Sequence, residues 1–207
     1  MSMVQISTAV SKLGASIPCV NLPPIITCRP DAPCAKCAKE GGGCYALRGH
    51  FSFPKVKERL QENLKAYYEN PKLYFETIAQ TFSLYKYARF HSSGDIVDEN
   101  YLKGMCWLAR KCKTTEILCF TKKFELVNNY VANGHKIPKN LHIVFSAWRN
   151  FIPENPYNFP VSYVYFPKDK ENNKLIPENA WPCAGNCEKC LACFNLPKGS
   201  SVYFRKH

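Results

Sequence analysis

The fold is decided by residues 87–145, which read YARFHSSGDIVDENYLKGMCWLARKCKTTEILCFTKKFELVNNYVANGHKIPKNLHIVF. Amphipathic segments with helical periodicity separate three apolar, strand-like runs, at 87–91, 116–120 and 141–145. Asp98 and Thr121 are suitable N-caps for the two helices between them. Strands that alternate with helices pair in parallel, because parallel neighbours need long crossover connections. The stretch therefore predicts an α/β protein.

The segments on either side extend this pattern. Two further helices are expected before it, one with apolar positions from Val56 to Tyr67 and one that begins at Asn70. After it, a proline-rich stretch leads to a strand at 161–166, and the C-terminal SSVYFRKH is a candidate edge strand. A complete eight-stranded barrel usually takes about 250 residues. The 207 residues are therefore predicted to form a single domain, as a partial (β/α) barrel or an open parallel sheet.

Composition and charge restrict the function classes. Apolar residues make up 46% and charged residues 21%, which is typical of a globular protein and not of a disordered chain. The sequence has no apolar run long enough for a membrane span and no signal-like start, so we expect a cytoplasmic protein without a membrane partner. The formal charge of +12 favours an anionic partner, either a small molecule or a nucleic acid. Aromatic residues beside basic ones, in YKYARFH and VYFRKH, are compatible with single-stranded nucleic acid.

Cysteine usage is the most unusual feature of the sequence. Two groups of cysteines lie near the two ends of the chain, in a loop over 28–44 (Cys28, Cys34, Cys37 and Cys44) and in a loop over 183–193 (Cys183, Cys187, Cys190 and Cys193). The remaining four, Cys19, Cys106, Cys112 and Cys119, are scattered and are expected to be small buried hydrophobes. Clustered thiols in a reducing compartment usually bind metal, so both loops are predicted to bind metal.

The spacing of the C-terminal group indicates which metal. Cys183, Cys187, Cys190 and Cys193 follow the pattern C-x3-C-x2-C-x2-C, and four soft thiolates on one short loop favour a 4Fe-4S cluster. A structural zinc site usually takes pairs of cysteines from separate hairpins, so zinc is the alternative, above all if the two groups pool their ligands. The N-terminal group has the less regular spacing C-x5-C-x2-C-x6-C. One or two clusters are therefore expected.

Polar residues follow the predicted central strands and make up a candidate strand-end pocket. The candidates for catalysis are His91, Asp95, Lys122 and Arg149, and those for cofactor binding are Ser93, Gly94 and Ser146. Active sites of parallel sheets gather beyond the carboxyl ends of the strands, and the two cations favour an anionic ligand. The alternative is structural: His91 bonds within the sheet and Asp95 stabilises a turn.

The order of these segments resembles a known family. CYA after the first cysteines, RFHSSGDI at a strand end, DENYLKGM, ILCFTKK, LHIVFSAW and a late CAGNCEKCLACF together resemble the phage gene-product-88 family. The resemblance covers most of the chain. It implies a phage-encoded, cysteine-rich protein of the bacterial cytoplasm and carries over no established activity.

A more distant likeness is to the radical S-adenosylmethionine enzymes, which hold a 4Fe-4S cluster at the mouth of a partial barrel. Cys183, Cys187 and Cys190 match their C-x3-C-x2-C spacing, and Gly94–Asp95 lies where their acidic cofactor-binding turn is found. That family places its triad after the first strand and leaves one iron free, whereas this triad is C-terminal and Cys193 adds a fourth thiolate. The likeness implies S-adenosylmethionine as a possible cofactor.

The leading hypothesis is an iron-sulfur protein with a strand-end pocket for an anionic ligand, with redox or radical chemistry as its enzymatic form. The alternative is a zinc-stabilised module that binds nucleic acid without catalysis.

Overall fold

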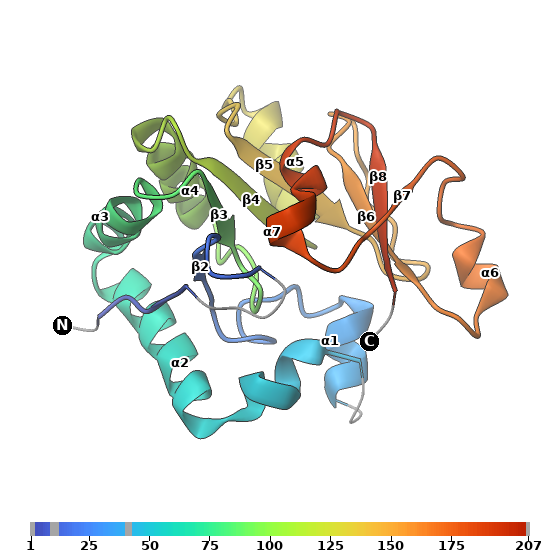
Figure 1. Ribbon diagram of the computed structural model, residues 1–207, viewed down its shortest axis with the longest axis horizontal. Helices are drawn as coiled ribbons and strands as arrows, with labels where there is room; N and C mark the ends of the chain where they lie inside the picture. Colours follow the sequence, from blue (N-terminus) through green and yellow to red (C-terminus); the bar gives the residue numbers. More distant parts are fainter. Residues whose placement is uncertain (1–2, 9–12, 40–42, 206–207) are drawn as a thin grey trace.

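The computed structural model describes residues 3–8, 13–39 and 43–205, and it leaves the side chains of residues 37–39 undescribed. Its centre is one open sheet of eight strands in the order β1-β2-β3-β4-β5-β6-β8-β7 (Figure 1). The strands are β1 (Ile6–Ser7), β2 (Cys19–Val20), β3 (Tyr87–Phe90), β4 (Glu116–Thr121), β5 (Leu141–Ser146), β6 (Val161–Tyr165), β7 (Trp181–Pro182) and β8 (Ser201–Arg205). Only β1 pairs antiparallel to its neighbour; the other pairings are parallel.

The described residues form seven α-helices in the segments between these strands. They are α1 (Pro33–Lys39), α2 (Pro54–Glu69), α3 (Pro71–Phe82), α4 (Glu99–Lys111), α5 (Phe124–Ala132), α6 (Lys170–Asn173) and α7 (Cys187–Cys190). Three short 3-10 turns, η1 (Tyr45–Leu47), η2 (Gly49–Ser52) and η3 (Ala192–Phe194), complete the described elements. No helix among the described residues is long and apolar enough to cross a membrane.

The helix starts follow the capping residues in the sequence. The Asn70 side chain accepts a hydrogen bond from the backbone N–H of Leu73 at 3.0 Å, and Pro71 occupies the first position of α3. The Asp98 carboxylate accepts from the N–H of Tyr101 at 2.7 Å and begins α4. The prediction for α5 is displaced by two residues, because Lys123 is the N-cap and its N–H donates to the Thr121 hydroxyl at 2.9 Å.

The two faces of the sheet have different covers. On one face, the apolar sides of α2 to α5 form the main core with alternate strand residues such as Ala88 and Phe90. On the other face, a smaller cluster brings Phe194 from the C-terminal cysteine loop against Leu118 and Val144. Figure 1 shows α7 of that loop in front of the sheet, with α4 and α5 behind it. The C-terminal cysteine loop therefore lies on the face that the long helices leave uncovered.

The sheet confirms part of the predicted fold and corrects another part. The α/β class, the parallel central strands and the open sheet are observed, whereas a barrel is not confirmed, since β1 and β7 remain separate edges. The C-terminal segment is wrongly predicted as an edge, because β8 lies between β6 and β7. The polar segment at 168–174 contains the short helix α6, which Asp169 caps by accepting from the N–H of Asn172.

Candidate functional site

The carboxyl ends of three strands are tied together by buried polar groups. The backbone N–H groups of Ser92 and Ser93, just after β3, donate to the side-chain oxygen of Asn21 at 2.6 and 3.1 Å. Asn21 itself follows β2, and its backbone carbonyl accepts from the Asn63 amide on α2 at 2.8 Å. The turn after β3 therefore depends on a residue that the sequence analysis did not single out.

Asp95 extends this network to β4. Its buried carboxylate accepts from the Thr121 hydroxyl at 2.6 Å, from the N–H of Lys122 at 2.9 Å and from the N–H of Ile96 at 2.7 Å. Burial raises the pKa of Asp95, and these hydrogen bonds act in the opposite direction. The carboxylate oxygens are engaged in holding the strand ends, which matches the structural alternative for this residue.

The predicted cations Lys122 and Arg149 lie along one aromatic row. The ammonium of Lys122 donates to the Ser146 hydroxyl at 2.8 Å and lies 5.9 Å from the centre of the Trp148 ring. The Trp148 ring packs edge-on against Phe166, and the exposed guanidinium of Arg149 lies 5.0 Å from that second ring. The ends of β4 and β5 and the residues that follow them thus place both cations and Ser146 along this aromatic row.

His91 lies elsewhere, within the helical layer. Only 3% of its surface is exposed, and its Nε2 bonds to the Tyr101 hydroxyl on α4 at 3.0 Å. Its Nδ1 is buried without a hydrogen-bond partner. Burial, with smaller effects from the charges of Arg89 and Lys123, lowers the pKa of His91 to about 3, so the imidazole is neutral near pH 7. The structure therefore separates His91 from Lys122 and Arg149.

Ser93 and Gly94 form the inner wall of the turn. The Ser93 hydroxyl donates to the carbonyl of Leu22 at 3.0 Å, and Ser93 is 2% exposed. Gly94 has φ of 81°, and a Cβ placed there would lie 2.7 Å from the Leu22 Cβ and 2.8 Å from the Thr27 hydroxyl oxygen. Glycine is required here by a close approach of two backbone segments. The structure gives these residues a packing role, and their cofactor role stays a prediction.

The N-terminal cysteines lie beside this strand-end network. Three of them are half-buried: Cys28, Cys34 and Cys44. Their thiols are close enough to interact electrostatically. Burial is the main cause that raises the pKa of Cys28 to about 12, and the charge of Asp95 also raises it. Cys37 lies in α1, and its side chain falls outside the described residues. The described thiols of this group therefore lie within electrostatic range of one another, and metal binding by them stays a prediction.

The C-terminal cysteines form a second, separate group. Cys183 follows β7, Cys187 and Cys190 are the ends of α7, and Cys193 lies in η3. Burial, with smaller effects from Cys183, Cys187 and Cys190, raises the pKa of Cys193 to about 12, so these three thiols lie within electrostatic range of Cys193. Cys190 is the exposed member of the group.

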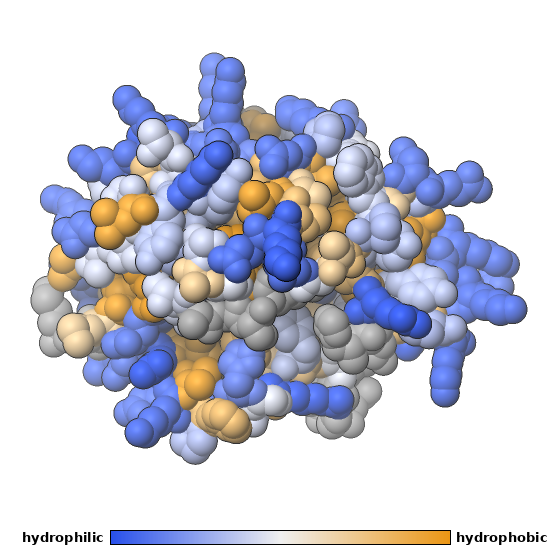
Figure 2. Space-filling view, viewed as in Figure 1, coloured by the Kyte–Doolittle hydropathy of each residue, from blue (hydrophilic) through white to orange (hydrophobic). Residues whose placement is uncertain are grey.

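Several contacts fix this loop on the molecule. The Phe194 ring, 1% exposed, lies 4.9 Å from the Tyr87 ring on β3. The Asn186 side chain caps α7 by accepting from the N–H of Lys189 at 3.1 Å. The Glu188 carboxylate accepts from the backbone N–H of Ser16 at 3.1 Å and from its hydroxyl. The loop is thus held at its centre and at its end while Cys190 faces solvent. Figure 2 shows hydrophilic atoms over the position of α7, with hydrophobic atoms beside them.

Arg89 on β3 interacts with both the turn after β3 and the C-terminal cysteine loop. Its Nε donates to the carbonyl of His91 at 3.3 Å, and its guanidinium lies 4.9 Å from the centre of the Phe120 ring. Its charge also acts to lower the pKa of Cys19 and Cys193, against the larger effect of burial. Successive side chains of a strand point to opposite faces of the sheet, so the sequence YARF of β3 could have predicted that Arg89 lies on the face opposite Ala88 and Phe90.

The cysteine side chains that the structure describes form no disulfide. The four scattered cysteines, Cys19, Cys106, Cys112 and Cys119, are buried, as predicted. Among the described residues, no three Cys, His, Asp or Glu side chains already stand at the spacing that holds a metal ion.

Fold and site together define a cysteine-rich protein with an open, mostly parallel α/β sheet, in which one thiol group lies beside a polar strand-end network. A family model described as Gene product 88 matches residues 4–196. The chain belongs to the gene product 88 family. No curated protein and no solved structure matches it. The likeness to radical S-adenosylmethionine enzymes gains no support, and Cys183 follows the edge strand β7 instead of a first strand.

Proposed function

We propose that this protein binds a 4Fe-4S cluster through Cys183, Cys187, Cys190 and Cys193. The observation that carries the proposal is that these four cysteines lie within eleven residues on one short loop, which Phe194 anchors to the sheet, and that the other three thiols lie close enough to Cys193 to affect its pKa. Soft thiolates on a compact loop are the usual ligands of iron-sulfur clusters. The cluster would supply one-electron redox chemistry when bound.

The protonation of the thiols determines how metal binding to the C-terminal cysteine loop depends on pH. Burial raises the pKa of Cys193, so in the metal-free chain its thiol is protonated near pH 7. Metal ligands are thiolates, so binding releases protons and weakens as the pH falls. Arg89, whose charge favours the thiolate of Cys193, reduces the cost of that deprotonation.

We propose further that the strand-end site binds an anionic ligand at Lys122. The ammonium is held at a defined position by the Ser146 hydroxyl and the face of the Trp148 ring. The indole Nε1 of Trp148 is buried without a hydrogen-bond partner, and the cation Arg149 lies further along the same aromatic row. Asp95 and Gly94 shape this site, and His91 belongs to the packed layer behind it.

The metal proposal is tested by measuring iron, zinc and acid-labile sulfide in protein purified without oxygen, together with its visible absorption spectrum. The expected result is equal iron and sulfide, about four of each per bound cluster, with broad absorption near ~400 nm. The replacement Cys187→Ser is expected to reduce iron content and thermal stability together. A colourless protein that contains zinc would overturn the iron-sulfur assignment and make the thiols structural.

The ligand proposal is tested separately by thermal denaturation with inorganic pyrophosphate as the probe. Wild-type protein is expected to melt at a higher temperature with pyrophosphate, because a ligand that binds only the native state stabilises it. The replacement Lys122→Gln should remove most of this rise. The matched control, Lys168→Gln, changes an exposed lysine outside the site and should leave it intact. Equal loss in both variants would contradict a defined site at Lys122.

A further inference from the structure

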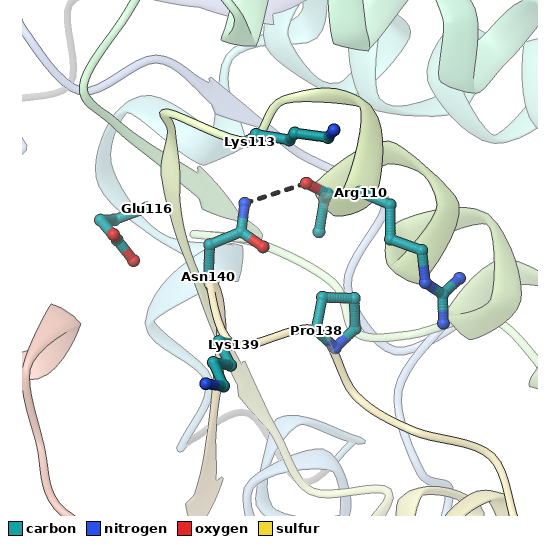
Figure 3. A pocket seen from close by; sticks show the side chains of 7 residues that line it. Arg110, Lys113, Glu116, Pro138, Lys139 and Asn140 are labelled. Atoms are coloured by element: carbon teal, nitrogen blue, oxygen red, sulfur yellow. Dashed lines mark hydrogen bonds between the residues drawn. The ribbon is translucent and has the colours of Figure 1, made fainter.

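A hollow opens at the opposite end of the sheet from the strand-end site. It has a volume of about 560 Å³ and lies between the end of α4 and the amino ends of β4 and β5. Figure 3 shows Arg110 and Lys113 on the α4 side, with Glu116, Pro138 and Lys139 on the strand side. The sequence analysis assigned nothing to this end of the molecule.

The wall of the hollow is rigid. The side-chain amide of Asn140 donates to three backbone carbonyls, those of Ala109 at 2.9 Å, Cys112 at 2.9 Å and Thr115 at 3.0 Å. It thereby joins the end of α4 to the start of β5, and Figure 3 shows it at the centre of the hollow. The backbone between Ala109 and Asn140 therefore holds the surrounding side chains at defined positions.

The charge around this wall is strongly positive. Arg110, Lys113 and Lys139 are exposed, and none of the three forms an ion pair with a carboxylate in the described chain. The acidic residue Glu116 is engaged by His142, whose Nε2 lies 2.6 Å from its carboxylate oxygen. Three more exposed lysines lie close to these residues in sequence: Lys86, Lys111 and Lys136. Hydrogen bonds to their backbone carbonyls place Lys136 and Lys86 near the hollow. The carbonyl of Lys136 accepts from the Arg110 guanidinium at 3.2 Å, and the carbonyl of Lys86 accepts from the N–H of Glu116 at 2.8 Å.

An exposed aromatic ring accompanies these cations. Trp107 lies one helical turn before Arg110 on α4 and is 41% exposed. Residues three apart on a helix are surface neighbours, so this ring and the guanidinium occupy the same side of α4. Exposed aromatic faces beside cations are the usual contacts of nucleic-acid bases and phosphates.

We propose that this basic end of the sheet binds the phosphodiester backbone of a single-stranded nucleic acid. Sites for small molecules usually enclose most of their ligand, whereas this hollow is open and its cations are distributed around it. A polyanion satisfies several separated cations at once, and Trp107 offers a base a stacking surface. The proposal does not depend on iron or on the site at Lys122, because it uses other residues at the opposite strand ends.

The test is fluorescence anisotropy with a labelled single-stranded DNA of about 20 nucleotides, titrated at several salt concentrations. The variant replaces Arg110, Lys113 and Lys139 by glutamine. The control replaces three exposed cations of the same types on α2, as Lys55→Gln, Lys57→Gln and Arg59→Gln, so both proteins lose the same formal charge. Because the side chains are exposed, both variants are expected to fold, which circular dichroism checks.

We expect the variant to bind the DNA at least about tenfold more weakly than the wild type. The slope of log affinity against log salt concentration should also become shallower, by an amount that corresponds to about two to three fewer released counterions. The control should change the affinity by about twofold or less. Equal weakening of DNA binding in the variant and the control would show that only net charge matters and would overturn the proposal. A wild-type protein that does not bind the DNA would overturn it as well. Displacement of the DNA by inorganic phosphate at constant ionic strength would assign the hollow to a small anion and would also contradict it.

Discussion

Asn21 and Asp95 organise the strand ends, because their side-chain oxygens accept hydrogen bonds from the backbone after β3 and after β4. Asp95 follows a strand in a Ser-Ser-Gly-Asp turn, which is a recognisable sequence signal. Asn21 follows β2, a strand of two residues that has no detectable periodicity. Its importance comes from Ser92 and Ser93, which lie far away in sequence and meet it only in the folded chain. Contacts of this kind are not visible in local sequence.

The close approach at Gly94 gives a direct prediction for stability. We expect Gly94→Ala to lower the free energy of unfolding by about 2 kcal/mol or more, because φ is 81° and the new Cβ would lie 2.7 Å from the Leu22 Cβ. The matched control is Gly134→Ala, where φ is 83° and nothing lies within 4 Å of the new Cβ. That change should cost only about 1 kcal/mol. Urea denaturation measures both, and equal costs would contradict the packing argument.

His91 makes stability depend on pH on the acid side. Its pKa falls from an ordinary value of 6.5 to about 3 on folding, mainly by burial, so below pH 6.5 the unfolded chain binds a proton that the native state excludes. Stability therefore decreases from pH 6.5 toward 3, with a limiting slope of about 1.4 kcal/mol per pH unit. Asp95 has the opposite effect: burial raises its pKa in the native state, so protonation of Asp95 increases the stability as the pH falls.

The variant His91→Gln isolates this contribution. It keeps a polar group beside Tyr101 and removes the titration, so the decrease in stability between pH 6.5 and 3 should become shallower. Urea denaturation at a series of pH values measures the slope. The same slope in wild type and variant would show that other groups cause the acid sensitivity.

At the level of elements, the sequence predicted long units well and short ones poorly. The α3 and α4 helices were located by their caps Asn70 and Asp98, and β3 to β6 by their apolar runs. The strands β1, β2 and β7 contain two residues each and are defined only by their partners. The position of β8 inside the sheet, between β6 and β7, likewise depends on tertiary pairing.

The C-terminal cysteine loop depends on one aromatic contact with the sheet. We expect Phe194→Ala to detach η3 from Tyr87 and Leu118 and to expose Cys193, whose pKa would then fall from about 12 toward an ordinary thiol value. Alkylation of Cys193 in the metal-free protein, followed by mass spectrometry, should become faster. Alkylation of the buried Cys112 in the same sample serves as the internal control. Unchanged reactivity of Cys193 would contradict the anchoring role of Phe194.

On the scale of the whole molecule, three chemically distinct regions surround one sheet. The N-terminal thiols lie beside Asp95 at the carboxyl ends of the strands, the C-terminal thiols lie on the face opposite the long helices, and the basic hollow lies at the amino ends. The cysteine spacing and the charge were readable from the sequence. Their separation into three places was not, because it follows from strand order and from the alternation of side chains across the sheet.

The central claim is that the C-terminal loop holds an iron-sulfur cluster, and the most direct test is the iron content of Cys190→Ala beside Cys34→Ala. Cys190 is exposed, so its loss should not disturb the metal-free fold, and Cys34 is the matched thiol of the other group. After anaerobic purification, we expect Cys190→Ala to lose about four irons per chain and Cys34→Ala to keep at least that number. Wild-type iron content in Cys190→Ala, or zinc in place of iron in the wild type, would contradict it.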